Sequence, residues 1–584
     1  MRLFLIRVPQ PFEHAVKRCR GHFVMVAAFS AFINLLYLAP TIYMMQVYDR
    51  VVPTGGLMTL YALTLIVAAA IAILCALDAV RAQLLLRASM RINRLLSVDV
   101  MHRALSGSGN GPSIQAMRDF DTVRSALSGP GVTAIFDAPW APLYVLVAFA
   151  IHPLLGVLVL LGGGVLVVLA LLNERANRVN GTLAHRAQTR AYADQEATFR
   201  AAEVVQALGM GRALVGRHSL QRQGGLTASL KLQATNGRFN ALVKFVRMFM
   251  QSLALGAGAW LAVQNQISVG SIIAASVLLS RALQPVEQIV GAWPSLTQAR
   301  QSLASLEKLF AETQGDGKPQ LALPEPTGRL QFSAVGVISS DSGTPLLNNV
   351  SFALDPGQLT GVVGPSGAGK TTLARAAAGA IAPHFGEILM DGARFSEWEP
   401  DRLARSIGYL PQHAGLLPGT VAENISRFSL GSDAGAWPQQ HIHEEVVRAS
   451  TMAGVHDTIL RLPDGYQTLI GTEGQALSAG QAQRIALARA LFGSPRVLIL
   501  DEPNSALDAE GEEALGRAIA SACRDGAAVM MVAHRANVLS KAHSLIVMHA
   551  GAIVKQGPRA QVLGELAAES ARANVVPLKE RASS

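Results

Sequence analysis

The first half of the chain contains six apolar segments that are each about as long as a lipid bilayer is thick. A hydrocarbon core about 30 Å thick is crossed by roughly 20 helical residues. Because lipid offers the backbone no hydrogen-bond partners, an isolated segment can span it only as a helix. The sequence therefore predicts an α-helical membrane domain with six spans, at residues 22–43, 57–77, 135–151, 154–173, 242–263 and 267–287.

The charge of the loops between these segments predicts how the chain is oriented. The loop 78–130 carries seven arginines and the loop 175–240 is similarly basic, whereas the connections on the opposite side are short and carry few charges. Basic loops remain in the cytosol. Because the number of spans is even, both termini are expected to be cytoplasmic. Both basic loops have helical apolar spacing, so the membrane helices are expected to continue into the cytosol.

The charge balance differs between the two halves of the chain. The net charge is +10, but residues 1–320 hold 29 Lys and Arg against 15 Asp and Glu, whereas residues 321–584 hold 21 against 25. A nucleic-acid-binding ATPase would carry its basic excess on the soluble domain. The composition therefore argues against a nucleic-acid partner.

Changes in composition along the chain predict five parts, and no internal repeat is apparent. They are a cytosolic N-terminal segment at 1–21, a transmembrane domain with long cytosolic helix extensions at 22–310, a linker rich in proline, glycine and charge at 311–329, a soluble α/β domain at 330–565, and a C-terminal tail at 566–584.

A phosphate-binding loop is predicted near the start of the soluble domain. The segment "LTGVVGPSGAGKTTLARAAAG" places an apolar strand before a glycine-rich loop and a helical pattern after it, which is the context such a loop requires. Its glycines let backbone N–H groups surround the phosphates, Lys370 offers a positive charge, and Thr371 offers a hydroxyl to Mg²⁺. A simple glycine-rich turn is the alternative. The candidate nucleotide-binding residues here are Gly364, Pro365, Ser366, Gly367, Ala368, Gly369, Lys370, Thr371 and Thr372.

Three further segments offer candidate catalytic groups. "VLILDEP" reads as a buried strand that delivers Asp501 and Glu502 at its carboxyl end, where parallel sheets place their ligand chemistry. Asp501 is expected to hold Mg²⁺, and Glu502 to orient and polarise the attacking water. Gln412 is a candidate for sensing both Mg²⁺ and the water, and His534 for reaching the γ-phosphate. An acidic strand end, an ordinary loop glutamine and a structural histidine are the alternatives.

These motifs, taken in order with "LSAGQ" and "SALD", resemble the nucleotide-binding domain of ATP-binding-cassette (ABC) transporters. The resemblance covers nearly all of residues 330–560. It implies an α/β phosphate-loop domain that binds ATP and Mg²⁺, with a signature segment that contacts the γ-phosphate bound by another subunit. A chain with one such domain is therefore expected to act as a homodimer. The implied nucleotide contacts of this segment are Ser478, Ala479, Gly480 and Gln481, joined by Asp508 of "SALD".

One feature departs from the family pattern. Many members stack adenine on an aromatic residue upstream of the phosphate loop, whereas Ile338 and Ser339 occupy the expected place here. We therefore expect the protein to discriminate poorly between ATP and GTP.

Two stretches of the membrane half, "YMMQVYDRVVPTGG" at 43–56 and "FDAPWAPLYVLVAFAIHPLLG" at 136–156, resemble the permease and ATPase component of type I protein secretion systems. That resemblance implies export of unfolded proteins with uncleaved C-terminal signals, a bacterial inner-membrane location, and a periplasmic adaptor and an outer-membrane channel as partners. A lipid or drug exporter is one alternative, and a nucleotide-gated channel or sensor is another. Asp137 fits either an interface anchor or a substrate contact.

Overall fold

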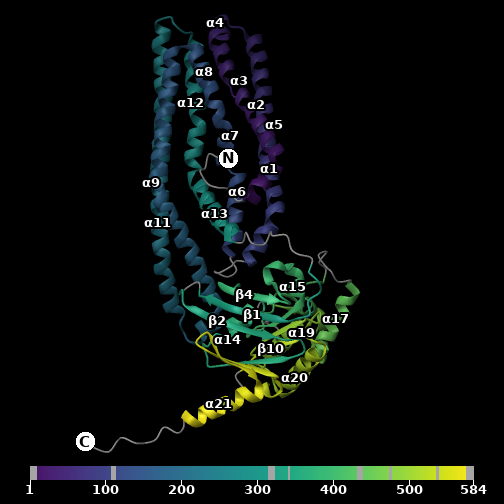
Figure 1. Ribbon diagram of the computed structural model, residues 1–584. Helices are drawn as coiled ribbons and strands as arrows, with labels where there is room; N and C mark the ends of the chain where they lie inside the picture. The colour runs from purple at the N-terminus through teal and green to yellow at the C-terminus, as the bar shows by residue number, and fades with distance from the viewer. Residues whose placement is uncertain are drawn as a thin grey trace, which may run out of the picture. The chain divides into compact units, whose positions relative to one another are not determined.

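The computed structural model describes residues 10–106, 114–312, 323–339, 342–430, 439–471, 477–533 and 538–573. These residues divide into two compact units, one ending at residue 312 and the other beginning at residue 323 (Figure 1). His534 lies outside the described residues.

Every regular element of the first unit, within the described ranges, is helical. The apolar stretches of this unit give six helical segments long and apolar enough to cross a membrane, so the predicted six-span fold is confirmed. The helices are α1 (Gln10–Arg18), α2 (Arg20–Leu36), α3 (Ala39–Gln46), α4 (Val52–Thr54), α5 (Leu57–Ser106), α6 (Ile114–Leu127), α7 (Pro130–Asp137), α8 (Ala141–Ile151), α9 (Pro153–Arg200), α10 (Ala202–Ala207), α11 (Gly211–Val263), α12 (Val269–Gly291) and α13 (Trp293–Glu312).

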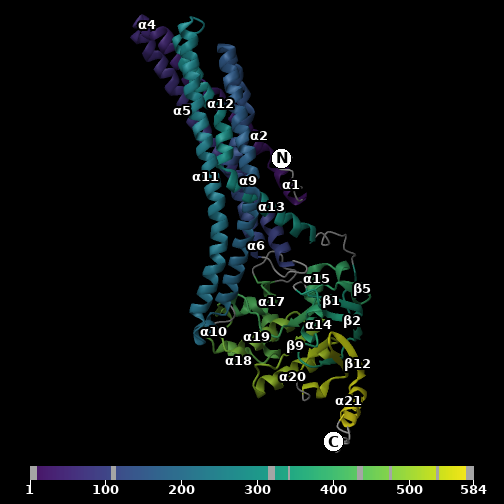
Figure 2. The same cartoon turned by 90° about the vertical axis from the view of Figure 1, so that its left-hand side faces the viewer.

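Three of these helices are much longer than a membrane is thick. The helices α5, α9 and α11 have 50, 48 and 53 residues. At 1.5 Å per residue each is roughly 70–80 Å long, more than twice the hydrocarbon core. Figures 1 and 2 show α9 and α11 side by side over most of their length.

Two spans are interrupted where the sequence carries prolines. The first span breaks between α2 and α3, with a proline in the first turn of α3, and continues through a π-helix at Val47–Val51 into α4. The third passes from α7 through a 3₁₀ turn at Ala138–Trp140 into α8. Proline is tolerated in the first turn of a helix, where its missing N–H has no intrahelical partner in any case. Both secretion-like stretches therefore contain a local break in helix geometry.

The second unit is built around a six-stranded sheet and a four-stranded sheet. The first has the order β12-β11-β3-β10-β9-β6 and the second β2-β1-β4-β5. The strands are β1 (Leu330–Ile338), β2 (Pro345–Leu354), β3 (Leu359–Val363), β4 (Phe385–Met390), β5 (Ala393–Arg394), β6 (Ile407–Leu410), β9 (Val497–Asp501), β10 (Ala528–Val532), β11 (Ser544–His549) and β12 (Ala552–Pro558), and a short pair is formed by β7 (Gly419–Thr420) and β8 (Leu469–Ile470).

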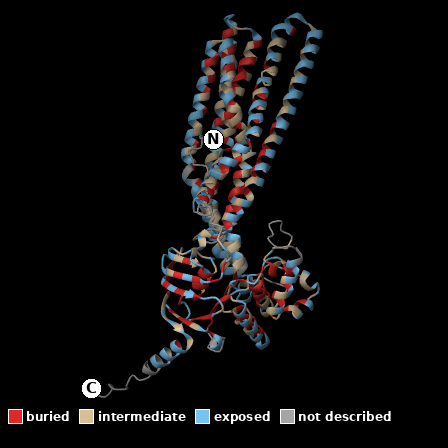
Figure 3. Ribbon diagram, turned by 45° about the vertical axis from the view of Figure 1, so that its right-hand side comes forward, coloured by how far each residue is buried: buried red, intermediate tan, exposed pale blue. Residues whose placement is uncertain are grey.

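The central strands of the six-stranded sheet are parallel and buried on both faces. The strands β3, β6, β9, β10 and β11 run parallel, and every residue of β9 and β10 is buried (Figure 3). Continuous apolar strands of this kind are typical of sheets covered by helices. The helices of this unit are α14 (Lys370–Ala377), α15 (Pro400–Ser406), α16 (Val421–Ile425), α17 (Gln439–Met452), α18 (His456–Leu460), α19 (Ala479–Leu491), α20 (Ala509–Arg524) and α21 (Arg559–Ala573).

Because β3 and β9 are parallel to the same strand, β10, their carboxyl ends meet at one edge of the sheet. The phosphate loop follows β3, and Asp501 ends β9. The predicted α/β phosphate-loop fold is therefore confirmed.

Candidate functional site

The phosphate loop joins β3 to α14. Gly367 and Gly369 have φ of 79° and 93°, in the left-handed region that glycine adopts without strain. A Cβ on Gly369 would also lie 2.8 Å from the carbonyl oxygen of Leu346. The Nζ of Lys370 donates to the carbonyl oxygens of Gly364 and Pro365, both at 2.9 Å, so the side chain folds back over its own loop. The loop and its lysine thus form a compact cradle.

Two oxygen donors meet beside this loop. The Thr371 hydroxyl lies in the first turn of α14 and donates to Oδ1 of Asp501 over 3.4 Å. Asp501 is buried at the end of β9. A hydroxyl and a carboxylate are hard oxygen ligands, so this pair fits the donor chemistry that Mg²⁺ requires.

Glu502 is held in an unusual backbone conformation next to Asp501. Its φ is 51°, and its N–H donates to the carbonyl oxygen of Val532 at 3.1 Å. A non-glycine residue in this region is strained and persists only when its surroundings hold it. The Nε2 of Gln412 donates to Oε2 of Glu502 at 3.2 Å. The structure therefore brings together two of the predicted catalytic side chains.

Two half-buried arginines hold the loop that follows Gln412 and the helix beside it. The guanidinium of Arg489, on α19, donates to the carbonyl oxygens of Ala414 and Gly415 at 2.6 and 2.9 Å. Arg427 donates to carbonyl oxygens of the same helix. Burial, and then the charge of Arg489, lowers the pKa of Arg427 to about 10, so the side chain remains cationic at neutral pH.

The "LSAGQ" segment forms the start of α19. Ser478 is the N-cap: its hydroxyl accepts from the backbone N–H of Gln481, and the Gln481 side chain accepts from the backbone N–H of Ser478. This capping box uses two of the donors at the helix start. The N–H groups of Ala479 and Gly480 remain at the positive end of the helix dipole, where an anion is stabilised.

A cavity of about 520 Å³ opens beside this helix start. Its lining includes Ser478, Gly480, Gln481, Arg484 and Asp508 but none of the phosphate-loop residues. Within the described part of the chain, no hydrogen bond joins these signature residues to the phosphate loop. The predicted nucleotide contacts therefore form two separate groups in one chain.

Asp508 has a structural role within its own chain. Its carboxylate caps α20 by accepting from the Gly511 N–H at 2.9 Å, and it pairs with Arg484 at 2.8 and 2.9 Å. The Gly511 hydrogen bond, followed by the charge of Arg484, lowers the pKa of the Asp508 carboxyl group below its usual value. A nucleotide contact by Asp508 stays a prediction.

The sequence analysis did not predict three side chains of α19 that contact the loops of the candidate site, which are Gln483, Arg484 and Arg489. They contact the loops that carry Glu502, Asp508 and Gln412. The signal was available, because polar residues recur in "AQRIALARA" within an otherwise apolar helix that should bury them. Gln483 in particular is only 4% exposed.

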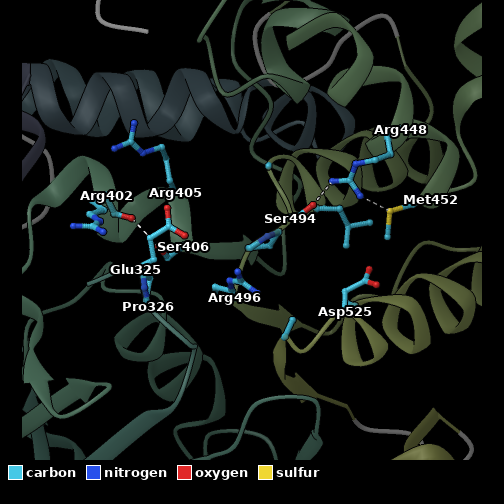
Figure 4. A pocket seen from close by; sticks show the side chains of 15 residues that line it. Glu325, Pro326, Arg402, Arg405, Ser406, Arg448, Met452, Ser494, Arg496 and Asp525 are labelled. Atoms are coloured by element: carbon cyan, nitrogen blue, oxygen red, sulfur yellow. Dashed lines mark hydrogen bonds between the residues drawn. The ribbon is translucent and has the colours of Figure 1, made fainter. Parts of the chain in front are cut away.

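A second cavity, of about 470 Å³, lies at the amino ends of β6, β9 and β10, on the edge of the sheet opposite to the phosphate loop. Figure 4 shows several arginines around it, including Arg402, Arg405 and Arg448. Arg448 is held by Ser494 at 2.8 Å and by Glu445. None of the predicted site residues lines this cavity, so it is separate from the candidate ATPase site.

Asp137, in the second secretion-like stretch, is part of a buried polar cluster that joins four helices. It accepts from Arg81 at 2.7 Å and from Asn34 at 3.0 Å. The hydroxyl of Tyr144 donates to the backbone and side-chain oxygens of Asn34 at 2.8 and 2.9 Å. The side chain of Asp137 is 13% exposed and that of Arg81 is 6% exposed. These contacts show that Asp137 joins helices of the membrane unit, and the two sequence interpretations, an interface anchor and a substrate contact, stay predictions.

Asp49, in the first secretion-like stretch, binds the start of α12. Its carboxylate accepts from the Ser268 hydroxyl at 2.6 Å and from the Gly270 N–H at 2.7 Å. A carboxylate at a helix N-terminus is stabilised by the helix dipole. The π-helix that carries Asp49 is thus hydrogen-bonded to the beginning of the last span, and we call these two hydrogen bonds, from Ser268 and Gly270 to Asp49, the clasp.

Comparisons with known proteins agree with this architecture. Residues 23–286 match the ABC transporter transmembrane region, and residues 347–505 match the ABC transporter family. The chain is 39% identical over 557 residues to the type I secretion system ATP-binding protein PrsD of Rhizobium meliloti (strain 1021), covering 94% of both chains. It is 27% identical over 567 residues to the alpha-hemolysin translocation ATP-binding protein HlyB of Escherichia coli, covering 95% of this chain and 78% of that relative.

A solved structure of a bacterial Atm1-family ABC exporter with ATP bound has the same fold. The TM-score is 0.77 at 22% identity, covering 97% of this chain and 99% of that one.

Proposed function

The chain belongs to the ABC transporter family and, within it, to the type I secretion ATP-binding proteins, and on that premise we propose how its own residues drive protein export. It is an ATP-driven protein exporter that hydrolyses ATP and spans the membrane of a bacterium. We further propose that its cargo is unfolded protein with an uncleaved C-terminal signal, that it works in the inner membrane with both termini cytoplasmic, and that a periplasmic adaptor and an outer-membrane channel complete the path. The relatives are secretion and translocation ATP-binding proteins, so they support protein export over the two alternatives, a lipid or drug exporter and a nucleotide-gated channel or sensor.

Each ATP site is proposed to form between two copies of the chain. One copy supplies the phosphate loop, where the Lys370 ammonium and the backbone N–H groups of residues 364–372 other than Pro365 hold the phosphates. The other copy supplies Ser478 and the N–H groups of Ala479 and Gly480. The observation that carries this proposal is the separation of these two groups in one chain. The N–H groups of Ala479 and Gly480 are not used by the capping box between Ser478 and Gln481. Two-fold symmetry then gives two equivalent sites.

Hydrolysis is assigned to the groups around Glu502. Its carboxylate is proposed to orient and polarise the attacking water, while Gln412 fixes that carboxylate through the 3.2 Å hydrogen bond. Thr371, Asp501 and Gln412 would hold Mg²⁺, which neutralises phosphate charge when bound. His534 is proposed to contact the γ-phosphate. Because phosphoryl transfer depends on placement and electrostatics, the strained backbone at Glu502 fits a residue selected for position.

The proposed function is tested by comparing secreted proteins from cells that produce the wild-type chain or its Glu502→Gln variant. We expect specific proteins to disappear from the medium of the variant and accumulate in the cell, as measured by mass spectrometry. An unchanged set of extracellular proteins together with altered envelope lipids would favour a lipid exporter. Full export by the variant would favour a nucleotide-gated channel.

The composite site is tested with mixed dimers of two differently tagged chains. When one chain carries Ser478→Arg, the site that uses its signature segment should lose ATP hydrolysis. ATP hydrolysis by the purified mixed dimer should therefore fall by at least half. Full activity in the mixed dimer, or equal activity in single chains, would contradict the proposal.

A further inference from the structure

Helix α19 contacts the segment 502–508 of its own chain at three successive places. A Cβ on Gly480 would lie 3.0 Å from the carbonyl oxygen of Ala506, Gln483 hydrogen-bonds the same segment, and Arg484 pairs with Asp508. The segment 502–508 contains the proposed catalytic glutamate at one end. The end of α19 that faces the partner's nucleotide is therefore in direct contact with the loop that serves the chain's own nucleotide.

Gln483 makes the most extensive of these contacts. Its Nε2 donates to the carbonyl oxygen of Pro503 at 2.8 Å, with longer contacts to the Ser505 hydroxyl at 3.3 Å and the Glu502 carbonyl oxygen at 3.4 Å. Its Oε1 accepts from the Ala506 N–H at 3.0 Å. One side-chain amide thus provides hydrogen bonds to both the Pro503 carbonyl oxygen and the Ala506 N–H.

The backbone groups around Gln483 require an amide side chain. Carbonyl oxygens need a donor and the Ala506 N–H needs an acceptor, and a glutamine side chain offers both. A carboxylate of the same size would face the Pro503 carbonyl with a second acceptor. A methionine would fill the space and satisfy neither group, which leaves buried polar atoms without partners. Because Gln483 is 4% exposed, water is poorly placed to replace it.

The hydrogen bonds of Gln483 are placed where they help to hold Glu502 in its left-handed conformation. The residue is held by Val532 through its N–H, by Gln412 through its carboxylate, and by Gln483 through the backbone that follows it. A strained conformation of this kind persists only when several contacts fix it. Of these three contacts, the one from Gln483 originates on the helix whose start faces the other nucleotide.

We propose that Gln483 is a positioning residue that ties the signature end of α19 to the backbone of Glu502, so that a γ-phosphate bound at the signature of one chain sets the hydrolytic geometry in that same chain. This rests on the composite site proposed above. The two sites of the dimer are thereby coupled through each chain's own α19.

The proposal is tested with Gln483→Glu and Gln483→Met in the purified full-length dimer. For both, we expect kcat for ATP hydrolysis to fall by about tenfold or more while the Kd of a fluorescent ATP analogue changes by less than about threefold. Ser450→Ala is the matched control, because Ser450 is also buried and donates to a backbone carbonyl, that of Val446 at 2.6 Å, within α17. Its kcat should stay within about twofold of the wild-type value.

A double-mutant cycle separates positioning from general damage. Gly480→Ala and Gln483→Met should be non-additive in kcat, because both act through the same link to residues 502–506. Gly480→Ala and Ser450→Ala should be additive. If the first pair is additive within about twofold, or if both Gln483 variants keep wild-type kcat, the proposal is overturned. A wild-type dimer without any ATPase activity would instead contradict the proposed function itself.

Discussion

The amide nitrogen of Gln412 lies 3.2 Å from a carboxylate oxygen of Glu502, and it donates a hydrogen bond that links two neighbouring strand ends. Gln412 follows β6 and Glu502 follows β9, and these strands are parallel neighbours in the six-stranded sheet. The loop after Gln412 is itself fixed by Arg489 on α19. A displacement of that loop would therefore act directly on the Glu502 carboxylate.

Glu502→Gln should slow ATP hydrolysis strongly and preserve nucleotide binding. The amide has the same shape as the carboxylate but lacks the charge that polarises water, and loss of such a group typically costs about 10²–10⁴-fold in rate. Phosphate release and the Kd for ATP, measured on the same preparation, check this. Glu510→Gln, at an exposed position in the first turn of α20, should leave the rate nearly unchanged. Rapid hydrolysis by Glu502→Gln would remove Glu502 from the proposed mechanism.

The ratio of kcat/KM for ATP and GTP should be within about tenfold, because no aromatic side chain stands at residues 338 and 339 to stack on the base. At this place the backbone N–H of Ile338 donates to Nδ1 of His384 at 3.3 Å, and that of Ser339 donates to the Thr344 carbonyl oxygen at 2.8 Å. The Ile338→Tyr substitution should then lower KM for ATP by a few-fold. A strong preference for ATP in the wild-type protein would contradict this expectation.

The sequence was informative wherever one residue type has one strong physical preference. Apolar length located the six spans, and the glycines around Lys370 located the loop whose left-handed φ values only glycine tolerates well. The strand before Asp501 was readable because a parallel, doubly covered strand is continuously apolar.

The rest depended on contacts between residues far apart in the chain. Nothing local to Asp137 indicates that Arg81, 56 residues earlier, is its partner, or that Asp49 binds a helix start 221 residues later. The contacts of Gln483 and Arg489 were not predicted for the same reason, because their acceptors are backbone atoms of loops elsewhere in the sequence. Polar residues within an apolar helical pattern were the available hint.

Asp137→Asn should destabilise the membrane unit, because it removes one of the carboxylates that neutralise Arg81 in a buried site. Breaking a buried ion pair by replacing one partner costs about 3–5 kcal/mol. The remaining contacts of Arg81 with Asp78 and Ser30 place the expected loss near the lower end of that range.

The thermal midpoint of the detergent-solubilised protein measures this effect. Asp121→Asn is the matched control, because Asp121 pairs with Arg124 three residues away and its side chain is 59% exposed. Exposed pairs contribute only about 0–1 kcal/mol. Equal midpoints for the two variants would show that the Arg81 cluster contributes no more than a surface pair.

Gly270→Ala should disrupt the clasp between the first and last spans. A Cβ at this position would lie 2.5 Å from the carbonyl oxygen of Met45 and 2.7 Å from Oδ2 of Asp49, and both atoms belong to the segment that the clasp holds. Oδ2 of Asp49 accepts from the Ser268 hydroxyl, so displacing this carboxylate would weaken the hydrogen bonds from Ser268 and Gly270. Overpacking of this kind costs about 1–3 kcal/mol.

The control is Gly164→Ala in α9, where a Cβ would meet nothing within 4 Å. Alanine is favoured over glycine within a helix by about 0.5–1 kcal/mol, so this variant should be neutral or slightly stabilised. Monodisperse yield in detergent and the export rate in cells should both fall for Gly270→Ala and stay at the wild-type level for Gly164→Ala. Equal yields and export rates for the two alanine variants would show that a folded exporter does not need the close approach of α12 to Asp49. The proposed role of the first secretion-like stretch, to hold the start of α12, would then have to be abandoned.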